Sequence, residues 1–310
     1  MKSHKLLLIV ASESISMMSA SNGDGDQHTL SSVFKNWYDS CLLLLKLKQS
    51  SDQALCENHE KRDAELRDDI LFRQPESTHL GDCPICFLPF LCSSDVDLKP
   101  CCSKLICNGC SFANFCRDRK EGLEHKCPFC RHPEVISFEE SVKHLAKRAE
   151  MNDPIALCRM GHQRYNEGEY DLAFEYWTKA AEVGDAKSQY RLSILYRQGL
   201  GVEKSEEKKL YYLEEAAIAG HLSARYNLGC CEVKNGRIDR AVKHWIIAAN
   251  LGHDESINLL KLCCKRGYVG KEDFASALLA HQTAVDCTKS PHREASKAAR
   301  KRGILVQCNK

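Results

Sequence analysis

The sequence predicts a mainly α-helical protein in which a small cysteine-rich module is followed by a solenoid of four two-helix repeats. Two observations carry this prediction. Ten of the 19 cysteines lie between Cys83 and Cys130, and from Asp153 onward the chain repeats at intervals near 34 residues. The 310 residues suffice for about two domains, and a hydrophobic content of 43% is enough for packed cores.

The net charge and the lengths of the apolar runs indicate which partners and which location to expect. The net charge is +2, which favours neither a nucleic-acid nor an anionic-membrane partner. The longest apolar runs, Leu6–Ala11 and Cys41–Leu45, fall far short of the about 20 residues that a membrane span needs. The first residues resemble a signal peptide, but an apolar core of six residues is short for one. Clustered free thiols suit a reducing compartment, so a cytoplasmic or nuclear location is expected.

The region before the cysteines is predicted in two parts. Residues 1–28 are rich in Ser, Asn, Gly and Asp and are expected to be a disordered lead. Residues 29–75 are expected to be helical, because apolar side chains recur at helical spacing from Leu30 to Lys48 and a charged stretch then ends before Pro75. Whether the first of these helices packs on its own protein or binds a partner stays open.

Residues 80–135 form the cysteine-rich module. It contains three C-x-x-C pairs and one vicinal pair: Cys83 and Cys86, Cys107 and Cys110, Cys127 and Cys130, and Cys101 and Cys102. Each C-x-x-C lets a turn direct two thiolates at one metal ion, and four such ligands close a tetrahedral zinc site. A lone C-x-x-C also suits a redox dithiol, but three of them within 48 residues favour a metal. The odd number of cysteines and their clustering argue against a disulfide scaffold, so two zinc ions are expected.

The order of these pairs resembles the RING finger. The resemblance implies an interleaved cross-brace that assigns Cys83, Cys86, Cys107 and Cys110 to one zinc ion and Cys101, Cys102, Cys127 and Cys130 to the other. Because four thiolates close each site, the ions are expected to be structural. Lys104 stands where most RING fingers place a histidine, so the module resembles the all-cysteine variant. Cys101 is the least secure ligand, and its alternatives are Cys92, Cys116 and His125.

A helical linker is predicted over residues 136–152. Ser137 and Glu140 have the spacing of a capping box. Asp153 is expected to be the N-cap of the next helix, with Pro154 at its first position. The connection from the cysteine-rich module to the repeats is therefore expected to be helical and fairly stiff.

The repeats are predicted over residues 153–288. The first and third units align without a gap at an offset of 68, which matches Gly161 with Gly229, Trp177 with Trp245, and Gly184 with Gly252. Glycines at the unit ends are expected to close helices in the left-handed conformation. The "A-x-x-x-L-G" openings and "A-A-x-x-G" endings resemble Sel-one-like repeats, relatives of the tetratricopeptide repeat. The fourth unit has Lys261 in place of the glycine, as expected of a terminal cap.

The solenoid is expected to bind another protein on its concave face, since stacked units create an extended groove. The tail, residues 289–310, carries seven Lys or Arg residues against one Glu and is expected to be a solvated basic end.

RING fingers are typically ubiquitin ligases, so the resemblance implies that the module recruits a ubiquitin-conjugating enzyme. Such a module positions the loaded enzyme and supplies no nucleophile, so no catalytic residue is expected. Three residues match the contact surface of the family: Ile85 inside the first pair, Pro128 inside the last pair, and Arg131 after the last cysteine. Asn114 stands where many RING fingers have a tryptophan, and Phe112 or Phe115 are the possible substitutes.

The function predicted from these resemblances is a RING-type ubiquitin ligase whose repeats bind a protein substrate or an adaptor. The combination resembles a large family in diatoms. The alternative is a non-catalytic zinc-binding scaffold that mediates protein–protein interaction. A nucleic-acid binder is disfavoured by the near-neutral charge, and a hydrolase or redox enzyme lacks a supporting constellation of residues.

Overall fold

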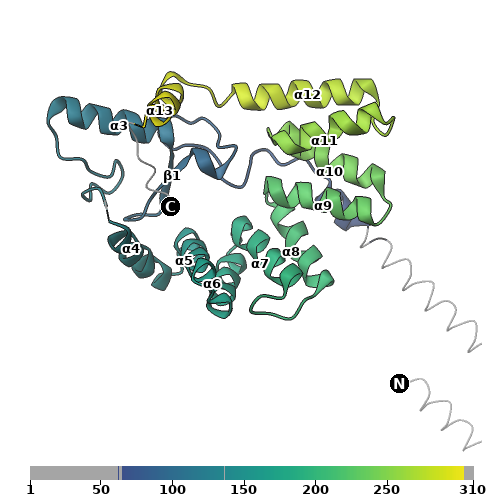
Figure 1. Cartoon of the computed structure of the whole chain (residues 1–310), viewed down its shortest axis with the longest axis horizontal. Coiled ribbons are helices and arrows are strands. Elements are labelled where there is room, and N and C mark those ends of the chain that lie inside the picture. The colour runs from purple at the N-terminus through teal and green to yellow at the C-terminus, as the bar shows by residue number, and fades with distance from the viewer. Residues whose placement is uncertain (1–61, 63–64, 136, 304–310) are drawn as a thin grey trace, which may run out of the picture. The chain divides into compact units, whose positions relative to one another are not determined.

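The computed structural model describes residues 62, 65–135 and 137–303. The predicted disordered lead over residues 1–28 and the amphipathic pattern from Leu30 to Lys48 lie outside the described residues. Residues 65–71 are helical, in line with the charged helix expected before Pro75. The described residues from Arg67 onward belong to one compact unit, whose helices α3 to α13 are labelled in Figure 1.

The cysteine-rich module is built around a short hairpin and one helix. After the 3-10 turn η1 (Ser93–Asp95), strand β1 (Val96–Lys99) pairs antiparallel with β2 (Lys104–Cys107), and α3 (Asn108–Glu121) follows directly. The apolar core consists of Phe90, Val96 and Ile106 around the sulfur atoms of three buried cysteines. So small a core does not normally hold a chain of this length folded without a further crosslink.

The linker helix α4 (Phe138–Glu150) begins and ends as the sequence predicts. The Ser137 hydroxyl accepts a hydrogen bond from the Glu140 amide at 3.0 Å, which satisfies one of the free amides of the first turn. Asp153 caps the following helix, because its Oδ1 accepts from the amides of Ile155 and Ala156 at 3.1 Å each. The predicted caps are therefore confirmed at both positions.

The repeats consist of successive helix pairs that follow one another in chain order (Figure 1). The pairs are α5 (Pro154–Asn166) with α6 (Tyr170–Glu182), α7 (Ala186–Gln198) with α8 (Glu206–Ile218), α9 (Leu222–Lys234) with α10 (Ile238–Asn250), and α11 (Asp254–Lys265) with α12 (Lys271–Asp286). Gly184, Gly220 and Gly252 end their units with φ of 87°, 83° and 85°, as the expected left-handed caps.

The glycines at the unit openings have a different role, which is to admit a tryptophan. A Cβ atom at Gly161 would lie 2.6 Å from the Trp177 ring, and one at Gly229 would collide with Trp245 in the same way. Trp177 is fully buried, and its Nε1 donates to the Cys158 carbonyl at 3.1 Å. The offset of 68 residues thus repeats one packing unit, in which a glycine on one helix receives the indole of the next.

The C-terminal tail differs from the sequence prediction. Residues Pro291–Lys301 form helix α13, which is capped by Ser290 and packs against α3 of the cysteine-rich module (Figure 1). Arg293 of this helix is only 6% exposed. The expectation of a solvated end therefore fails for one face of this helix, where Arg293, Ser296 and Ala299 are buried, while most of its other residues are exposed.

Candidate metal centre and its exposed surface

The eight predicted ligands assemble into two groups of four sulfur atoms. The groups are Cys83, Cys86, Cys107 and Cys110, and Cys101, Cys102, Cys127 and Cys130, and the sulfur atoms within each group all lie within 4.8 Å of one another. The Cys86 and Cys107 sulfurs are 3.8 Å apart, and those of Cys102 and Cys127 are 3.7 Å apart. Tetrahedral zinc with Zn–S bonds of about 2.3 Å requires edges of about 3.8 Å. Both groups could therefore hold a metal ion, and the described cysteines are all free thiols.

The first C-x-x-C pair folds into a tight loop held by the backbone. The Cys83 amide donates to the Leu88 carbonyl at 3.0 Å, and the Phe87 amide donates back to the Cys83 carbonyl at 2.8 Å. Phe87 has a left-handed φ of 57°, which turns the chain after the second cysteine. The same two bonds recur 44 residues later, from Cys127 to His132 at 2.8 Å and from Arg131 to Cys127 at 3.1 Å. Two matching loops thus present two sulfurs each, with Arg131 in the position of Phe87.

The vicinal cysteines reach one group because they sit at the tip of the β1–β2 hairpin. Ser103 adopts a left-handed φ of 55°, and the Cys102 amide donates to the Lys99 carbonyl at 3.2 Å. The tight turn brings the Cys101 sulfur to 3.3 Å from that of Cys130.

The alternatives to Cys101 lie elsewhere. The sulfur of Cys92 contacts the Ser94 hydroxyl at 2.9 Å, Cys116 is exposed, and the His125 ring lies 2.8 Å from Asp118. Cys101 is therefore the residue that completes the second group.

The crowding of the thiols shifts their acidities in opposite directions. The hydrogen bond from Cys107 lowers the pKa of Cys83 to about 4, and the same bond raises the pKa of Cys107. Burial raises the pKa of Cys110 to about 12. Cys83 is thus stabilised as a thiolate, while its neighbours Cys107 and Cys110 hold their protons more tightly. A dication would stabilise all four as thiolates, and its binding would release protons.

Arg293 is a residue at the first group that sequence reasoning missed. Its guanidinium donates to the carbonyls of Pro89 and Leu88 at 2.8 and 2.9 Å, and its Nη2 lies 3.8 Å from the Cys86 sulfur. A Cβ atom on Gly109, which lies between Cys107 and Cys110, would be 2.6 Å from the Arg293 amide nitrogen. Arg293 is 207 residues from Cys86, so no local spacing could have indicated it. The signal in the sequence is Gly109, since a larger residue there would collide with the backbone of Arg293.

Arg293→Ala should weaken metal binding at the first group selectively. The substitution removes both carbonyl bonds that fix the first loop and the cation beside the Cys86 sulfur. Residues that support metal ligands typically contribute about 10–100-fold to affinity. Zinc transfer from the full chain to a chromophoric chelator should become at least about tenfold faster for one of two equivalents. Arg300→Ala is the control, because Arg300 lies on the same helix, is half-buried and donates only a 3.4 Å hydrogen bond to the Ser94 carbonyl. Equal rates in both variants would contradict the role of Arg293.

The predicted contact residues for a conjugating enzyme lie at the surface. Ile85 is 42% exposed and Arg131 is exposed, while Pro128 is half-buried. Phe87 is 77% exposed and adds a large apolar side chain that the sequence interpretation did not single out. α13 contacts the module at Gly109 and at the carbonyls of the first loop, and it leaves these side chains exposed.

Asn114, at the position where many RING fingers have a tryptophan, makes polar contacts. The Asn114 amide donates to Asp118 at 3.2 Å and to the Lys126 carbonyl at 3.4 Å. Phe115 packs edge-on against His125, with ring centroids 5.6 Å apart. Asn114 therefore links α3 to the loop before the last cysteine pair.

One arginine connects the module to the repeats. Arg148 of α4 donates to the Ser103 hydroxyl at 2.7 Å and pairs with Asp153 at 2.6 Å. Ser103 belongs to the hairpin tip that carries the vicinal cysteines, and Asp153 caps α5. The stiff connection expected from the sequence is thus supplemented by a side-chain bridge.

Part of the repeat surface is already covered by the chain itself. Arg67 pairs with Glu214 and Glu215 of α8 at 2.9 Å each, and Asp68 accepts a bidentate pair of bonds from Arg240 of α10. Phe72 lies beneath the Arg240 guanidinium, 4.7 Å from its carbon to the ring centroid. A partner on the repeats would therefore have to bind beside this segment or displace it.

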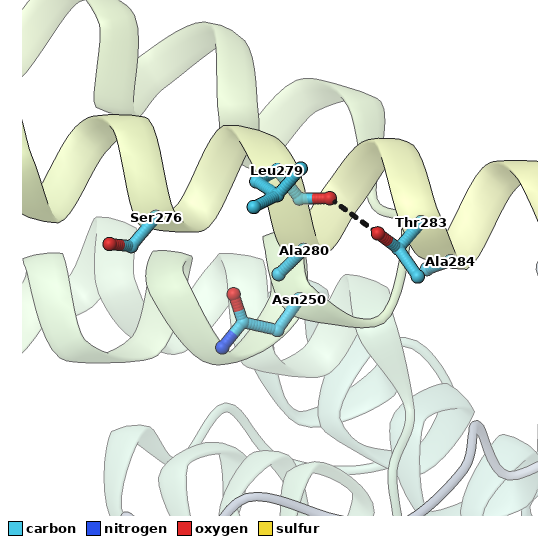
Figure 2. A pocket seen from close by; sticks show the side chains of 6 residues that line it. All are labelled: Asn250, Ser276, Leu279, Ala280, Thr283 and Ala284. Atoms are coloured by element: carbon cyan, nitrogen blue, oxygen red, sulfur yellow. Dashed lines mark hydrogen bonds between the residues drawn. The ribbon is translucent and has the colours of Figure 1, made fainter.

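A surface hollow lies along α12, away from the sulfur groups. Figure 2 shows its lining residues, which are Asn250, Ser276, Leu279, Ala280, Thr283 and Ala284. The Thr283 hydroxyl is bound to the Leu279 carbonyl at 2.9 Å, and none of the six side chains is charged. This hollow offers small apolar contacts but no metal-ligating or acid–base group.

The family model of the Sel1 repeat matches residues 154–185, 186–221 and 222–253. These segments are Sel1 repeats, as the sequence motifs predicted, and Sel1 repeat proteins mediate protein–protein interactions. The fourth unit lies beyond the matches but forms the helix pair α11 and α12. No RING family model matches the chain.

Two curated relatives match this chain at low identity. Mouse DAP3-binding cell death enhancer 1 is 23% identical over 200 residues, which cover 52% of this chain and 39% of that protein. Chitin synthase regulatory factor 4 of Schizosaccharomyces pombe is 27% identical over 134 residues, covering 41% of this chain and 21% of that protein. The chain thus spans well under half the length of these relatives.

Among solved structures, a Sel1 repeat protein from Oxalobacter formigenes is similar at 22% identity and a TM-score of 0.41, covering 64% of this chain and 81% of that one. Within the described ranges, the helices are all too short or too polar to cross a membrane.

Proposed function

We propose that this protein is a RING-type ubiquitin ligase that recruits a ubiquitin-conjugating enzyme through the zinc module and a protein substrate or adaptor through the Sel1 repeats. The observation that carries the proposal is the interleaved pairing of eight cysteines into two groups of zinc-compatible geometry. Two closed four-thiolate sites leave no open position for water, so the metal would act by holding the module folded. The chain's own contribution is to form two loops with matching backbone hydrogen bonds, one at each sulfur group.

The exposed side chains of these loops support the proposal. Ile85 lies between Cys83 and Cys86, both turned toward the sulfur group, so its side chain is directed outward. With Phe87 it places two large apolar side chains on the surface of one loop. Exposed apolar groups gathered in this way usually mark a contact surface. Arg131 stands at the matching position of the second loop, where a planar guanidinium can engage two carbonyls at once.

The arrangement would promote transfer by positioning. A conjugating enzyme bound at the loops and a substrate bound at the repeats would be joined through α4 and its Arg148 bridge. Holding two reactants in a fixed relation supplies part of the barrier lowering without any nucleophile from the chain. The mouse relative is named for binding another protein, DAP3, which is in keeping with a partner-binding role for such chains.

Ile85→Ala should weaken binding of conjugating enzymes by at least about 30-fold, since a buried apolar anchor at an interface contributes about 2 kcal/mol or more. Isothermal titration with a panel of conjugating enzymes would measure this, while the zinc content stays the same. Leu279→Ala is the matched control, because Leu279 is exposed and lies on α12.

Arg131→Ala should leave that binding nearly intact but slow ubiquitin discharge onto free lysine by about tenfold, because the arginine would act on the loaded thioester. A zinc-loaded chain that is inert with every conjugating enzyme tried would contradict the ligase proposal. That outcome would favour the scaffold alternative.

A further inference from the structure

A group of nitrogen-bearing side chains gathers on the first repeats, which we name the basic cluster. It consists of Arg159 and His162 on α5, Lys187 and Arg191 on α7, and His221 just before α9. Four of these side chains are half-buried and His221 is buried. Arg159 and His162 are three residues apart on α5, and Lys187 and Arg191 are four apart on α7, so each pair lies on one face of its helix. The His221 ring stacks on Tyr190 of α7, with centroids 4.4 Å apart. The charges of Lys187 and Arg191 also act on His162 of the other helix.

The charges in the basic cluster are poorly compensated. Burial lowers the pKa of His162 to about 4, with Arg191, Lys187 and Arg159 adding to the effect. Burial also lowers the pKa of Lys187, and the neighbouring arginines act in the same direction. Cys158 and, to a smaller extent, Asp185 act on the pKa of Lys187 in the opposite direction, and the Asp185 carboxylate is already bound to the Ser188 amide at 2.7 Å as a helix cap.

Hydrogen-bonding capacity in the basic cluster is also unused. Among the described residues, Arg159, Lys187 and Arg191 form no ion pair within 4.0 Å and no side-chain hydrogen bond. The Nδ1 atom of His162 is buried without a partner, as is that of His79. Half-buried cations and unpaired ring nitrogens are costly unless an acceptor meets them. A ligand rich in carboxylates would satisfy both.

A segment of the chain itself, residues 67–79, reaches the edge of the basic cluster. Residues 67–79 lie on α8 to α10, where Arg240 binds the Asp68 carboxylate and Arg225 donates to the Leu71 carbonyl. At the end of this segment His79 stacks on His221, with centroids 4.3 Å apart, and so reaches the edge of the basic cluster. A polypeptide segment that pairs with the repeats in both senses, Asp68 with Arg240 and Arg67 with Glu214, is therefore already bound next to the basic cluster.

We infer that the basic cluster binds an acidic segment of a protein partner, alongside the chain's own residues 67–79. The inference rests on the partner-binding role of the repeats in the proposed function and specifies the chemistry of that partner. Proteins that bind the nucleic-acid backbone typically have a strongly basic patch and an isoelectric point above about 9, whereas the isoelectric point of this chain is about 7.8. The near-neutral net charge of +2 also favours a local acidic contact over general polyanion binding.

The test uses the full zinc-loaded chain and a fluorescein-labelled octaglutamate peptide, with binding followed by fluorescence anisotropy. The double variant Lys187→Glu/Arg191→Glu should raise Kd by at least about tenfold, and the affinity of the unaltered chain should fall with added salt. The matched control Lys179→Glu/Arg197→Glu makes the same charge change at exposed positions on α6 and α7. Circular dichroism shows whether both variants keep the helical content of the parent.

Three results would overturn the inference. They are no binding of octaglutamate by the unaltered chain, equal loss in both double variants, and tighter binding of a labelled thymidine octanucleotide than of the peptide. The assay needs no conjugating enzyme. A chain that binds the peptide but is inert in ubiquitin discharge would therefore overturn the ligase proposal alone, and the reverse result would overturn this inference alone.

Discussion

Cys107→Ser should remove one of two zinc ions from the chain and unfold the cysteine-rich module. Cys107 is a member of the first sulfur group, and its side chain also accepts the Cys110 amide at the start of α3. The apolar core of the module is three side chains, so the free energy of structural zinc binding, about 10–16 kcal/mol in small zinc domains, would be most of its folding free energy.

Native mass spectrometry of the full chain would count the zinc ions directly. The unaltered chain should carry two, Cys107→Ser at most one, and Cys116→Ser still two, because Cys116 is exposed and belongs to neither group. Hydrogen exchange should show loss of protection in β1, β2 and α3 of the first variant, with the repeats unchanged. One zinc ion in the unaltered chain, or the absorbance of an iron–sulfur cluster, would refute the two-zinc assignment.

Trp177→Ala should destabilise the repeats by about 3–5 kcal/mol, the range typical of a large aromatic side chain removed from a core. The indole is fully buried, lies in the space left by Gly161 and bonds the Cys158 carbonyl. Its loss leaves a cavity between the first two helices of the solenoid and removes the indole bond to the Cys158 carbonyl. Since each repeat contacts only its neighbours, the loss of the indole should lower the stability of the first repeat more than that of the distant repeats.

Urea unfolding followed by far-UV circular dichroism would measure this loss. Tyr211→Ala is the control, because Tyr211 is 54% exposed and its removal should cost well under 1 kcal/mol. Gly161→Ala should also destabilise, since its new Cβ atom would lie 2.6 Å from the indole. A Trp177→Ala chain as stable as the control would show that the glycine–tryptophan contact does not organise the repeat.

The features that the sequence by itself determined are those with short-range causes. Ser137 and Asp153 cap helices through amides only two or three residues away, so spacing alone revealed them. The C-x-x-C pairs likewise bring two sulfurs together within one turn. The repeats could be recognised in the sequence because the glycine and tryptophan of the Gly161–Trp177 contact recur at an offset of 68 residues. Even the interleaved grouping of the cysteines, which came from resemblance, matches the groups that form.

Only the tertiary structure decided which surfaces are covered and which stay open. Arg293 lies at the first sulfur group, Arg148 bridges the hairpin to the first repeat, and residues 67–79 lie on α8 to α10. These contacts join residues from 45 to 207 positions apart. Neither periodicity nor capping extends that far, because both reflect interactions within one or two helical turns. The basic cluster has the same origin, since its cations come from separate helices that only the stacking of the repeats brings together.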